Sequence, residues 1–139
     1  MKIEKTYDLP FPVTAVYDNW VSSATIVPPA TRLYVEPFVG GHHQLFFDTA
    51  EGMSVNEGRF EIVEPNRRLR YSWEWNHDGQ VSHVDVRFAS KPGGTTIRLV
   101  HDGFRDRKRR ERHAAGWDSY IAGLIEILKR RVPQGVHGV

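Results

Sequence analysis

The feature that most constrains the fold is a run of strand-like segments between residues 33 and 101, separated only by short turns. The clearest segment spans residues 68–75, where every second side chain is large and apolar. This alternation is typical of a strand with one buried face. The Asp78-Gly79 pair that follows fits a tight hairpin turn, because both residues tolerate positive φ angles. Strands joined by short turns pair antiparallel, so the run predicts one antiparallel sheet.

Helix-like segments lie on both sides of this run. An alternating strand pattern at residues 3–9 is followed by apolar side chains at helical spacing in residues 13–21, and residues 22–25 predict a second short helical turn. Residues 107–131 keep helical spacing over a much longer stretch, and Pro133 prevents its continuation. We therefore expect one domain over residues 1–133, with residues 134–139 as a frayed tail.

This order of elements predicts an α+β fold in which six to seven antiparallel strands curve around a long C-terminal helix, with two short helices after the first strand. A curled sheet that grips one helix does not fill its interior as a sandwich does, so we expect a mainly apolar cavity between them. The side chains expected on the inner face of the sheet are Leu45, Phe47, Phe60, Ile62, Tyr71, Trp73, Val84, Val86, Phe88, Ile97 and Leu99.

The helix should complete the cavity. Its stripe contributes Trp117, Tyr120, Ile121 and Leu124 to the expected lining. The sheet contributes all the inner-face residues named above except Ile62 and Val84. For any one of these side chains, packing in a dry core is the competing interpretation, and the cavity is predicted from the topology rather than from a single aromatic residue.

Composition narrows the chemistry. The chain has no cysteine, which excludes disulfides, thiolate metal sites and thiol nucleophiles. Its N-terminus has no apolar signal-peptide run, and no segment is long and apolar enough to span a bilayer, so we expect a cytoplasmic protein that does not contact membranes. Six basic and two acidic residues lie in Arg105–Arg112, which leaves 13 basic and 15 acidic residues elsewhere. This single basic stripe differs from the broad charge of a nucleic-acid binder.

Several motifs carry a family resemblance that extends from the first strand to Leu128. They are Gly40-Gly41 before a strand, the segment Gly58–Leu69, Tyr71-Ser72-Trp73, the segment Gly94–His101, and His113-Ala114-Ala115-Gly116-Trp117. On these motifs the chain resembles the START-like, birch-allergen-like (SRPBCC) helix-grip superfamily. Within it, the chain is similar to the branch named for the activator of the heat-shock protein 90 ATPase.

The resemblance implies a START-like domain but no universal catalytic set. Relatives include binders of lipids and other hydrophobic molecules, polyketide cyclases and co-chaperone domains. A small hydrophobic or amphipathic ligand is therefore our first expectation, a cyclase or hydrolase that uses the same cavity the second, and a protein-interaction domain with a chaperone partner the third. We rank the third last because interaction roles in this branch usually involve an additional module. A monomer and a homodimer are both compatible with the sequence.

Histidines supply the candidate polar groups. The polar rim of the cavity is expected at His43, His101 and His113. Relatives often have a basic residue and an aromatic residue in the segment that corresponds to His42-His43-Gln44. Three histidines around one cavity would fit zinc, but no chelating spacing occurs, so we expect no metal and no cofactor. In the enzyme alternative, these histidines act as acid or base, and Asp102 or Tyr71 orients the substrate. No pair of titratable residues at diagnostic spacing is visible, so we assign no catalytic residue.

Two features of the long helix remain. Arg105–Arg112 lacks interleaved aromatics, so a solvated face is its simplest interpretation. Alternatively, Arg109 and Arg112 stand at the cavity entrance and attract a carboxylate on an apolar tail. Gly116 is unfavourable inside a helix, and we expect it where the sheet comes close.

Overall fold

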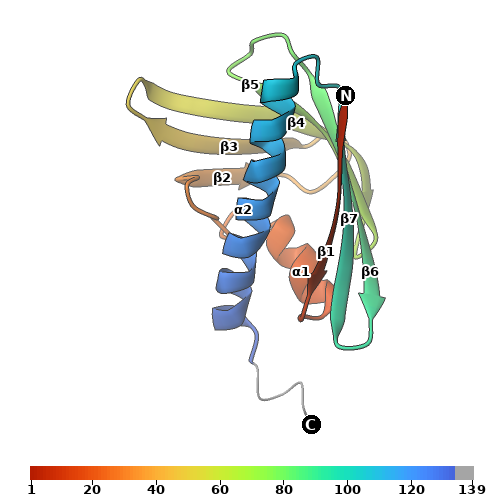
Figure 1. Cartoon of the computed structure of the whole chain (residues 1–139). Helices are drawn as coiled ribbons and strands as arrows, with labels where there is room; N and C mark the ends of the chain where they lie inside the picture. Colours follow the sequence, from red (N-terminus) through yellow and green to blue (C-terminus); the bar gives the residue numbers. More distant parts are fainter. Residues whose placement is uncertain (134–139) are drawn as a thin grey trace.

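Seven antiparallel strands form one sheet that curves around a single long helix in the computed structural model (Figure 1). The structure describes residues 1–133, so the expected C-terminal tail lies outside the described residues. The elements are β1 (Lys2–Leu9), α1 (Val13–Trp20), β2 (Arg32–Val35), β3 (His42–Thr49), β4 (Gly52–Glu64), β5 (Arg68–Trp75), β6 (Ser82–Lys91), β7 (Gly94–Asp102) and α2 (Arg107–Arg131). The predicted α+β helix-grip fold is confirmed.

The strand order is β1-β7-β6-β5-β4-β3-β2. Strands β2 to β6 are each paired with the next strand along the chain, as short turns require. Strand β1 instead pairs with β7, from Lys2 opposite Asp102 to Leu9 opposite Thr95. The first and last strands therefore lie side by side, and the segment between β1 and β2 crosses the concave side of the sheet (Figure 1).

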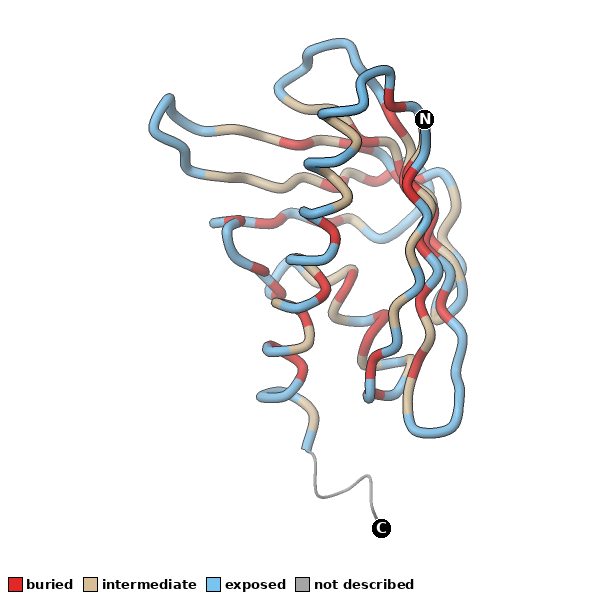
Figure 2. Tube along the Cα trace, viewed as in Figure 1, coloured by how far each residue is buried: buried red, intermediate tan, exposed pale blue. Residues whose placement is uncertain are grey.

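Helix α2 lies across the concave face and buries one stripe against it (Figure 2). Trp117, Ile121, Leu124 and Leu128 are buried, in agreement with the expected helical spacing. The Asp106 side chain accepts a hydrogen bond from the backbone N–H of Lys108 at 2.7 Å and so caps the start of the helix. Neither α1 nor α2, the helices described in residues 1–133, combines the length and apolar character needed to cross a membrane.

Only one of the two expected short helices is formed. Residues 22–25 make a turn, closed by the Thr25 N–H, which donates to the Ser22 carbonyl at 3.0 Å. The Ser22 hydroxyl accepts a hydrogen bond from the Ala24 N–H at 3.2 Å. A serine side chain that binds nearby backbone in this way competes with helix formation.

Strand β4 contains an irregularity that changes which side chains face the core. Phe60 is opposite Tyr71, but Ile62 is opposite Arg70, so one extra residue bulges between them. Beyond the bulge Val63 packs against the core, whereas Ile62 does not. The expectation that Ile62 lies on the inner face is therefore wrong, because strict alternation does not anticipate a bulge.

Candidate ligand-binding site

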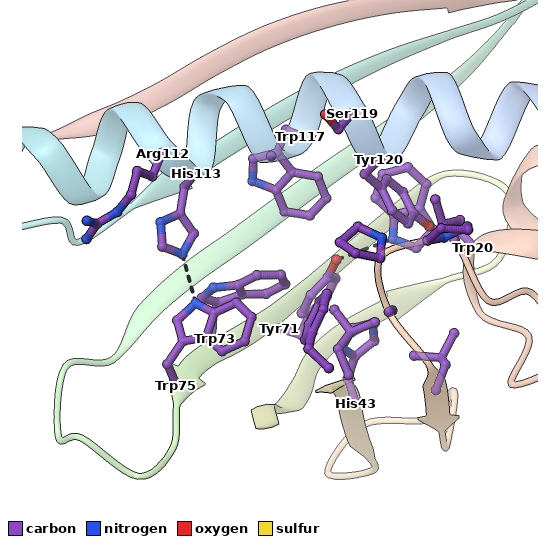
Figure 3. Close-up of a pocket in the computed structure, with 18 of the residues that line it drawn as sticks. Trp20, His43, Tyr71, Trp73, Trp75, Arg112, His113, Trp117, Ser119 and Tyr120 are labelled. Carbon is purple, nitrogen blue, oxygen red and sulfur yellow. Dashed lines mark hydrogen bonds between the residues drawn. The ribbon is translucent and has the colours of Figure 1, made fainter. Parts of the chain in front are cut away.

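A pocket of about 600 Å³ lies between α2, the end of α1, the segment before β2, and the inner faces of β3 and β5 (Figure 3). Its lining consists mainly of apolar side chains, with a few charged and polar groups toward the start of α2. The lining residues are Trp20, Thr25, Val27, Pro28, Pro29, Ala30, Leu33, His43, Leu45, Phe47, Tyr71, Trp73, Trp75, Asn76, Asp78, Arg109, Arg112, His113, Gly116, Trp117, Ser119 and Tyr120. This volume suits a small organic molecule.

All four tryptophans of the chain lie in the pocket wall. The alternation of β5 brings Trp73 and Trp75 to the same face, and Trp117 faces them from α2 (Figure 3). The ring centroids of Trp73 and Trp117 are 5.5 Å apart, and Trp20 stacks on Trp117 at 6.1 Å with an interplanar angle of 14°. Such packing holds the rings in place and leaves flat apolar surfaces for a ligand.

The structure divides the expected lining into two groups. Leu45, Phe47, Tyr71, Trp73, Trp117 and Tyr120 lie in the pocket wall. Outside it, in the packed core with exposed fractions of 0–5%, are Phe60, Val86, Phe88, Ile97, Leu99, Ile121 and Leu124. The reason is α1, which fills that part of the concave face: its Tyr17 and Trp20 rings pack edge-on against Phe88 at 5.4 and 5.6 Å.

The segment before β2 forms a part of the pocket wall that the sequence did not predict. Val27, Pro28, Pro29 and Ala30 line the pocket from a segment without helical or strand periodicity, so nothing in the pattern could place them. Trp75 could have been found, because it continues the alternation of β5 by one more inward position.

His101 lies inside the core, outside the pocket wall, and is 0% exposed. The Trp117 indole N–H donates to its Nδ1 at 3.0 Å, which assigns the ring proton to Nε2. Nε2 then donates to the Ser82 hydroxyl at 2.7 Å. Burial, with a smaller contribution from His113, lowers the pKa of His101 to about 3, so the ring is neutral at pH 7 with both nitrogens in use.

His113 is half-buried in the pocket wall, and its nitrogens are also both in use. The Trp75 indole N–H donates to Nε2 at 2.9 Å (Figure 3). This leaves Nδ1 to carry the proton, which it donates to the Arg109 carbonyl at 2.8 Å. Burial lowers the pKa of His113 below its ordinary value. Its hydrogen bonds fix the position of the Trp75 ring.

His43 differs from the other two because it has no hydrogen-bond partner. It is 5% exposed, lines the pocket and stacks on Tyr71 with ring centroids 4.6 Å apart. Its Nδ1 is buried without a partner in the described part of the chain. Burial lowers the pKa of His43 to about 4. The neighbouring His42 points to the other face, where its Nδ1 lies 3.4 Å from a Glu57 oxygen.

Two further buried side chains near the pocket hold polar atoms without partners among residues 1–133. Trp73 lines the pocket with its indole N–H unpaired. Asn56 is 0% exposed, lies opposite Leu45 and Trp75 on the neighbouring strands, and pairs neither its amide oxygen nor its nitrogen. Each unpaired buried polar group lowers the stability of the folded state by about 1–3 kcal/mol. Several such groups around one cavity are therefore unusual.

The charged groups gather at the end of the pocket nearest the start of α2. Arg109 forms an ion pair with Asp78 at 2.9 Å and donates to the Gln80 side-chain oxygen at 3.2 Å. Arg112 also lines the pocket, is exposed, and makes no hydrogen bond or ion pair with any residue of the described range 1–133. The two arginines of the expected entrance thus differ in their availability to a ligand, because only Arg109 already has an acidic partner.

Gly116 lies in the pocket wall, and the expected close approach of the sheet there is wrong. A Cβ atom at Gly116 would have no heavy atom within 4 Å. A close approach to the segment before β2, and not to the sheet, occurs two turns later, where a Cβ at Gly123 would lie 2.5 Å from Cγ1 of Val27.

The site offers little acid–base or metal chemistry. Within residues 1–133 no group of three or more His, Asp or Glu side chains is arranged to hold a metal ion. Asp102, named as a possible orienting group, is absent from the pocket lining. Burial raises the pKa of Tyr71 well above its ordinary value, so its hydroxyl keeps its proton.

Comparison with known protein families matches residues 10–129 to the family described as Activator of Hsp90 ATPase homolog 1-like protein. The chain belongs to this family. The match covers most of the sequence and confirms the branch that the motifs suggested. No curated protein matches the chain.

Solved structures share the fold of this family at low sequence identity. A protein from Mesorhizobium loti is 23% identical with a TM-score of 0.80, and 94% of this chain and 98% of that chain are covered. The AHSA1-like protein from Aeromonas hydrophila is 23% identical with a TM-score of 0.75 and 94% of each chain covered. The Aha1 dimer from Colwellia psychrerythraea is 11% identical with a TM-score of 0.77, covering 92% and 96%. At these identities the likeness concerns the fold alone.

Proposed function

We propose that this protein binds a small, mainly apolar molecule, aromatic or lipid-like, between its sheet and α2. The observation that carries the proposal is the pocket of about 600 Å³ whose wall contains every tryptophan of the chain. An apolar pocket with few polar groups is the usual form of a ligand site. The large rings pack around the pocket and do not fill it, so a flat apolar ligand would contact several of them at once.

The histidines favour binding over catalysis. His101 and His113 each use both ring nitrogens in hydrogen bonds to the protein, so neither has a nitrogen free to accept a substrate proton. His43 has no partner that would orient it as a base, and it stacks on Tyr71 instead of bonding to it. A general base is normally held by a second group, and this arrangement lacks one.

A chaperone-docking role has less support. It predicts a continuous exposed apolar patch outside the cavity. In residues 1–133 the exposed large apolar side chains are spread over separate segments, at Met1, Ile26, Tyr34, Phe38, Val39, Met53 and Val81. Scattered exposed apolar residues are normal for protein surfaces.

The test combines native mass spectrometry of the purified protein with a thermal-shift and tryptophan-fluorescence screen of fatty acids, flavonoids and polyketide-like aromatics. A ligand at about 100 times its Kd stabilises the folded state by about 2.7 kcal/mol, which raises the melting temperature. Because all four tryptophans line the pocket, a ligand bound there also changes the intrinsic fluorescence.

A matched pair of variants locates the binding. Gly116→Phe extends a ring from the open side of α2 into the pocket and should abolish both signals, whereas Gly116→Ala adds one methyl group in open space and should keep them. If no compound in the screen raises the melting temperature of the unmodified protein, the proposal is wrong.

A further inference from the structure

The pocket is elongated along α2 and has different polar groups at its two ends. Arg112 and His113 lie toward one end of the helix stretch that borders it, and Tyr120 toward the other, near Trp20 (Figure 3). Eight residues separate Arg112 from Tyr120, which corresponds to about 12 Å along a helix axis. His43 reaches the pocket from the opposite wall, stacked on Tyr71.

At the first end Arg112 is the cation available to a ligand. Arg109 is held by Asp78 and Gln80, and Arg110 donates to the Lys2 carbonyl at 2.7 Å. Arg112 is the basic residue of the lining that has no hydrogen bond or ion pair within residues 1–133. A guanidinium presents two parallel N–H groups that match a carboxylate.

At the second end His43 presents an unpaired polar ring inside an otherwise apolar wall. Only 5% of its surface is exposed, and its Nδ1 has no hydrogen-bond partner among the described residues. His43 lines the pocket, so its ring is in reach of a bound molecule. A buried polar group without a hydrogen-bond partner lowers the stability of the folded protein. A bound molecule with a hydroxyl or carbonyl group would supply the partner and remove this cost.

We infer that the pocket takes an elongated aromatic or polyene carboxylic acid, with its carboxylate at Arg112 and a hydroxyl or carbonyl oxygen at His43. This inference rests on the proposed function, because it names the ligand class of the same pocket. Cationic ligands are disfavoured, since Arg112 would repel them while the charge of Arg109 is already paired with Asp78. The stacked rings of Trp20, Trp73 and Trp117 suit the flat body of such an acid.

Three biphenyl probes separate the two ends. Hydroxybiphenylcarboxylic acid has a hydroxyl and a carboxyl group at opposite ends, biphenylcarboxylic acid lacks the hydroxyl, and phenylphenol lacks the carboxyl. Their affinities for the full chain would be measured by isothermal titration calorimetry at low salt. We expect the hydroxy acid to bind most tightly.

Variants assign each end of the probe. Arg112→Gln should weaken both acids by up to about fivefold, the upper range for a charge pair at an exposed site, and leave phenylphenol unchanged. Arg107→Gln removes the same charge from the same basic stripe outside the lining and should change none of the three affinities. His43→Phe should remove the advantage of the hydroxy acid over the plain acid without weakening the plain acid.

The outcomes distinguish this inference from the proposed function. If phenylphenol binds as tightly as the acids and Arg112→Gln has no effect, the acid assignment is wrong while the binding function stands. If Arg112→Gln and Arg107→Gln weaken the acids equally, the attraction comes from the whole stripe and Arg112 is not the anchor. If none of the probes binds the unmodified protein, both the inference and the aromatic-ligand form of the proposed function fail.

Discussion

At the scale of single residues, His101 explains how a polar side chain comes to lie in the core of this domain. Its two nitrogens link the Trp117 indole to the Ser82 hydroxyl, so the side chain fixes the Trp117 ring that lines the pocket. Ser82 in turn donates to the Trp73 carbonyl at 3.4 Å. The interior polar groups thus hold the pocket wall in position and do not belong to its surface.

The neutral state of His101 predicts a pH dependence of stability. An unfolded histidine titrates near pH 6.5, whereas the pKa of folded His101 is about 3. Between these values the unfolded chain binds more protons, so the free energy of unfolding falls as the pH falls below about 6.5. The slope for one such histidine approaches about 1.4 kcal/mol per pH unit well below pH 6.5, and buried His43, with a pKa of about 4, adds a similar slope. Urea melts between pH 7 and pH 5 measure it.

Substitution of His101 checks the assignment. His101→Phe should flatten this slope by about one proton, and at pH 7 it should lower the free energy of unfolding by about 1–3 kcal/mol, because Ser82 and Trp117 lose their partner. His77→Gln, at a side chain that is 77% exposed, should leave the slope as it is. An unchanged slope in His101→Phe would contradict the assignment.

His43 predicts the opposite effect on stability at pH 7. Because its Nδ1 is buried without a partner, His43→Phe should raise the free energy of unfolding by about 1 kcal/mol while it keeps a ring stacked on Tyr71. His77→Phe, at a side chain that is 77% exposed, should give no such gain. Urea denaturation of the two variants compares them directly, and a destabilised His43→Phe would show that the nitrogen has a partner in solution.

At the scale of elements, α2 contains two glycines in different surroundings. Gly116 faces the open pocket, and Gly123 faces Val27 from the segment before β2. Helix propensity treats both in the same way, since each glycine costs about 1 kcal/mol relative to alanine. Only the packing of the helix distinguishes them.

The two alanine variants should therefore differ. Gly116→Ala should raise the free energy of unfolding by about 0.5–1 kcal/mol, because the added methyl group meets nothing. Gly123→Ala should lose that gain or destabilise the protein, because its Cβ would lie 2.5 Å from Val27 Cγ1. Thermal and urea unfolding measure both, and equal effects would contradict the close contact at Gly123.

At the scale of the whole molecule, the turn after β5 is tied to the start of α2. The Arg109–Asp78 ion pair joins them beside the pocket, and Asn76 and Asp78 of this turn belong to the lining. The ion pair is partly exposed, with side-chain exposures of 20% and 31%. It therefore contributes little to global stability, and we expect it to restrain ligand entry at this end of the pocket.

The ion pair at this end of the pocket predicts a kinetic effect. Asp78→Asn should raise both the association and dissociation rates of a pocket ligand about two- to fivefold, in keeping with loss of up to about 1 kcal/mol, while Kd changes less. Stopped-flow tryptophan fluorescence measures these rates. Glu126→Gln breaks the Lys129–Glu126 pair on α2, whose residues lie outside the lining, and should leave them unchanged. Rates that do not respond to Asp78→Asn would show that ligands enter elsewhere.

The sequence by itself determined the strands, the two helices α1 and α2, and most of their apolar faces. The alternation of β5 predicted that Tyr71 and Trp73 share a face, and the helical spacing of α2 predicted that Trp117 and Leu124 lie on one apolar stripe. Both are local patterns, because the side-chain direction of a strand or helix follows from its own period. The His113-to-Trp117 motif, with the order of elements, also indicated the family.

Tertiary structure alone decided which part of the concave face stays open. α1 fills the side near Phe88, and the pocket remains beside Trp75 and Tyr120. It also decided that His101 is buried in the core while His113 lies in the wall, and that the bulge in β4 turns Ile62 outward. The physical reason is that periodicity specifies the direction of a side chain, whereas a cavity depends on the distance to whatever packs opposite it.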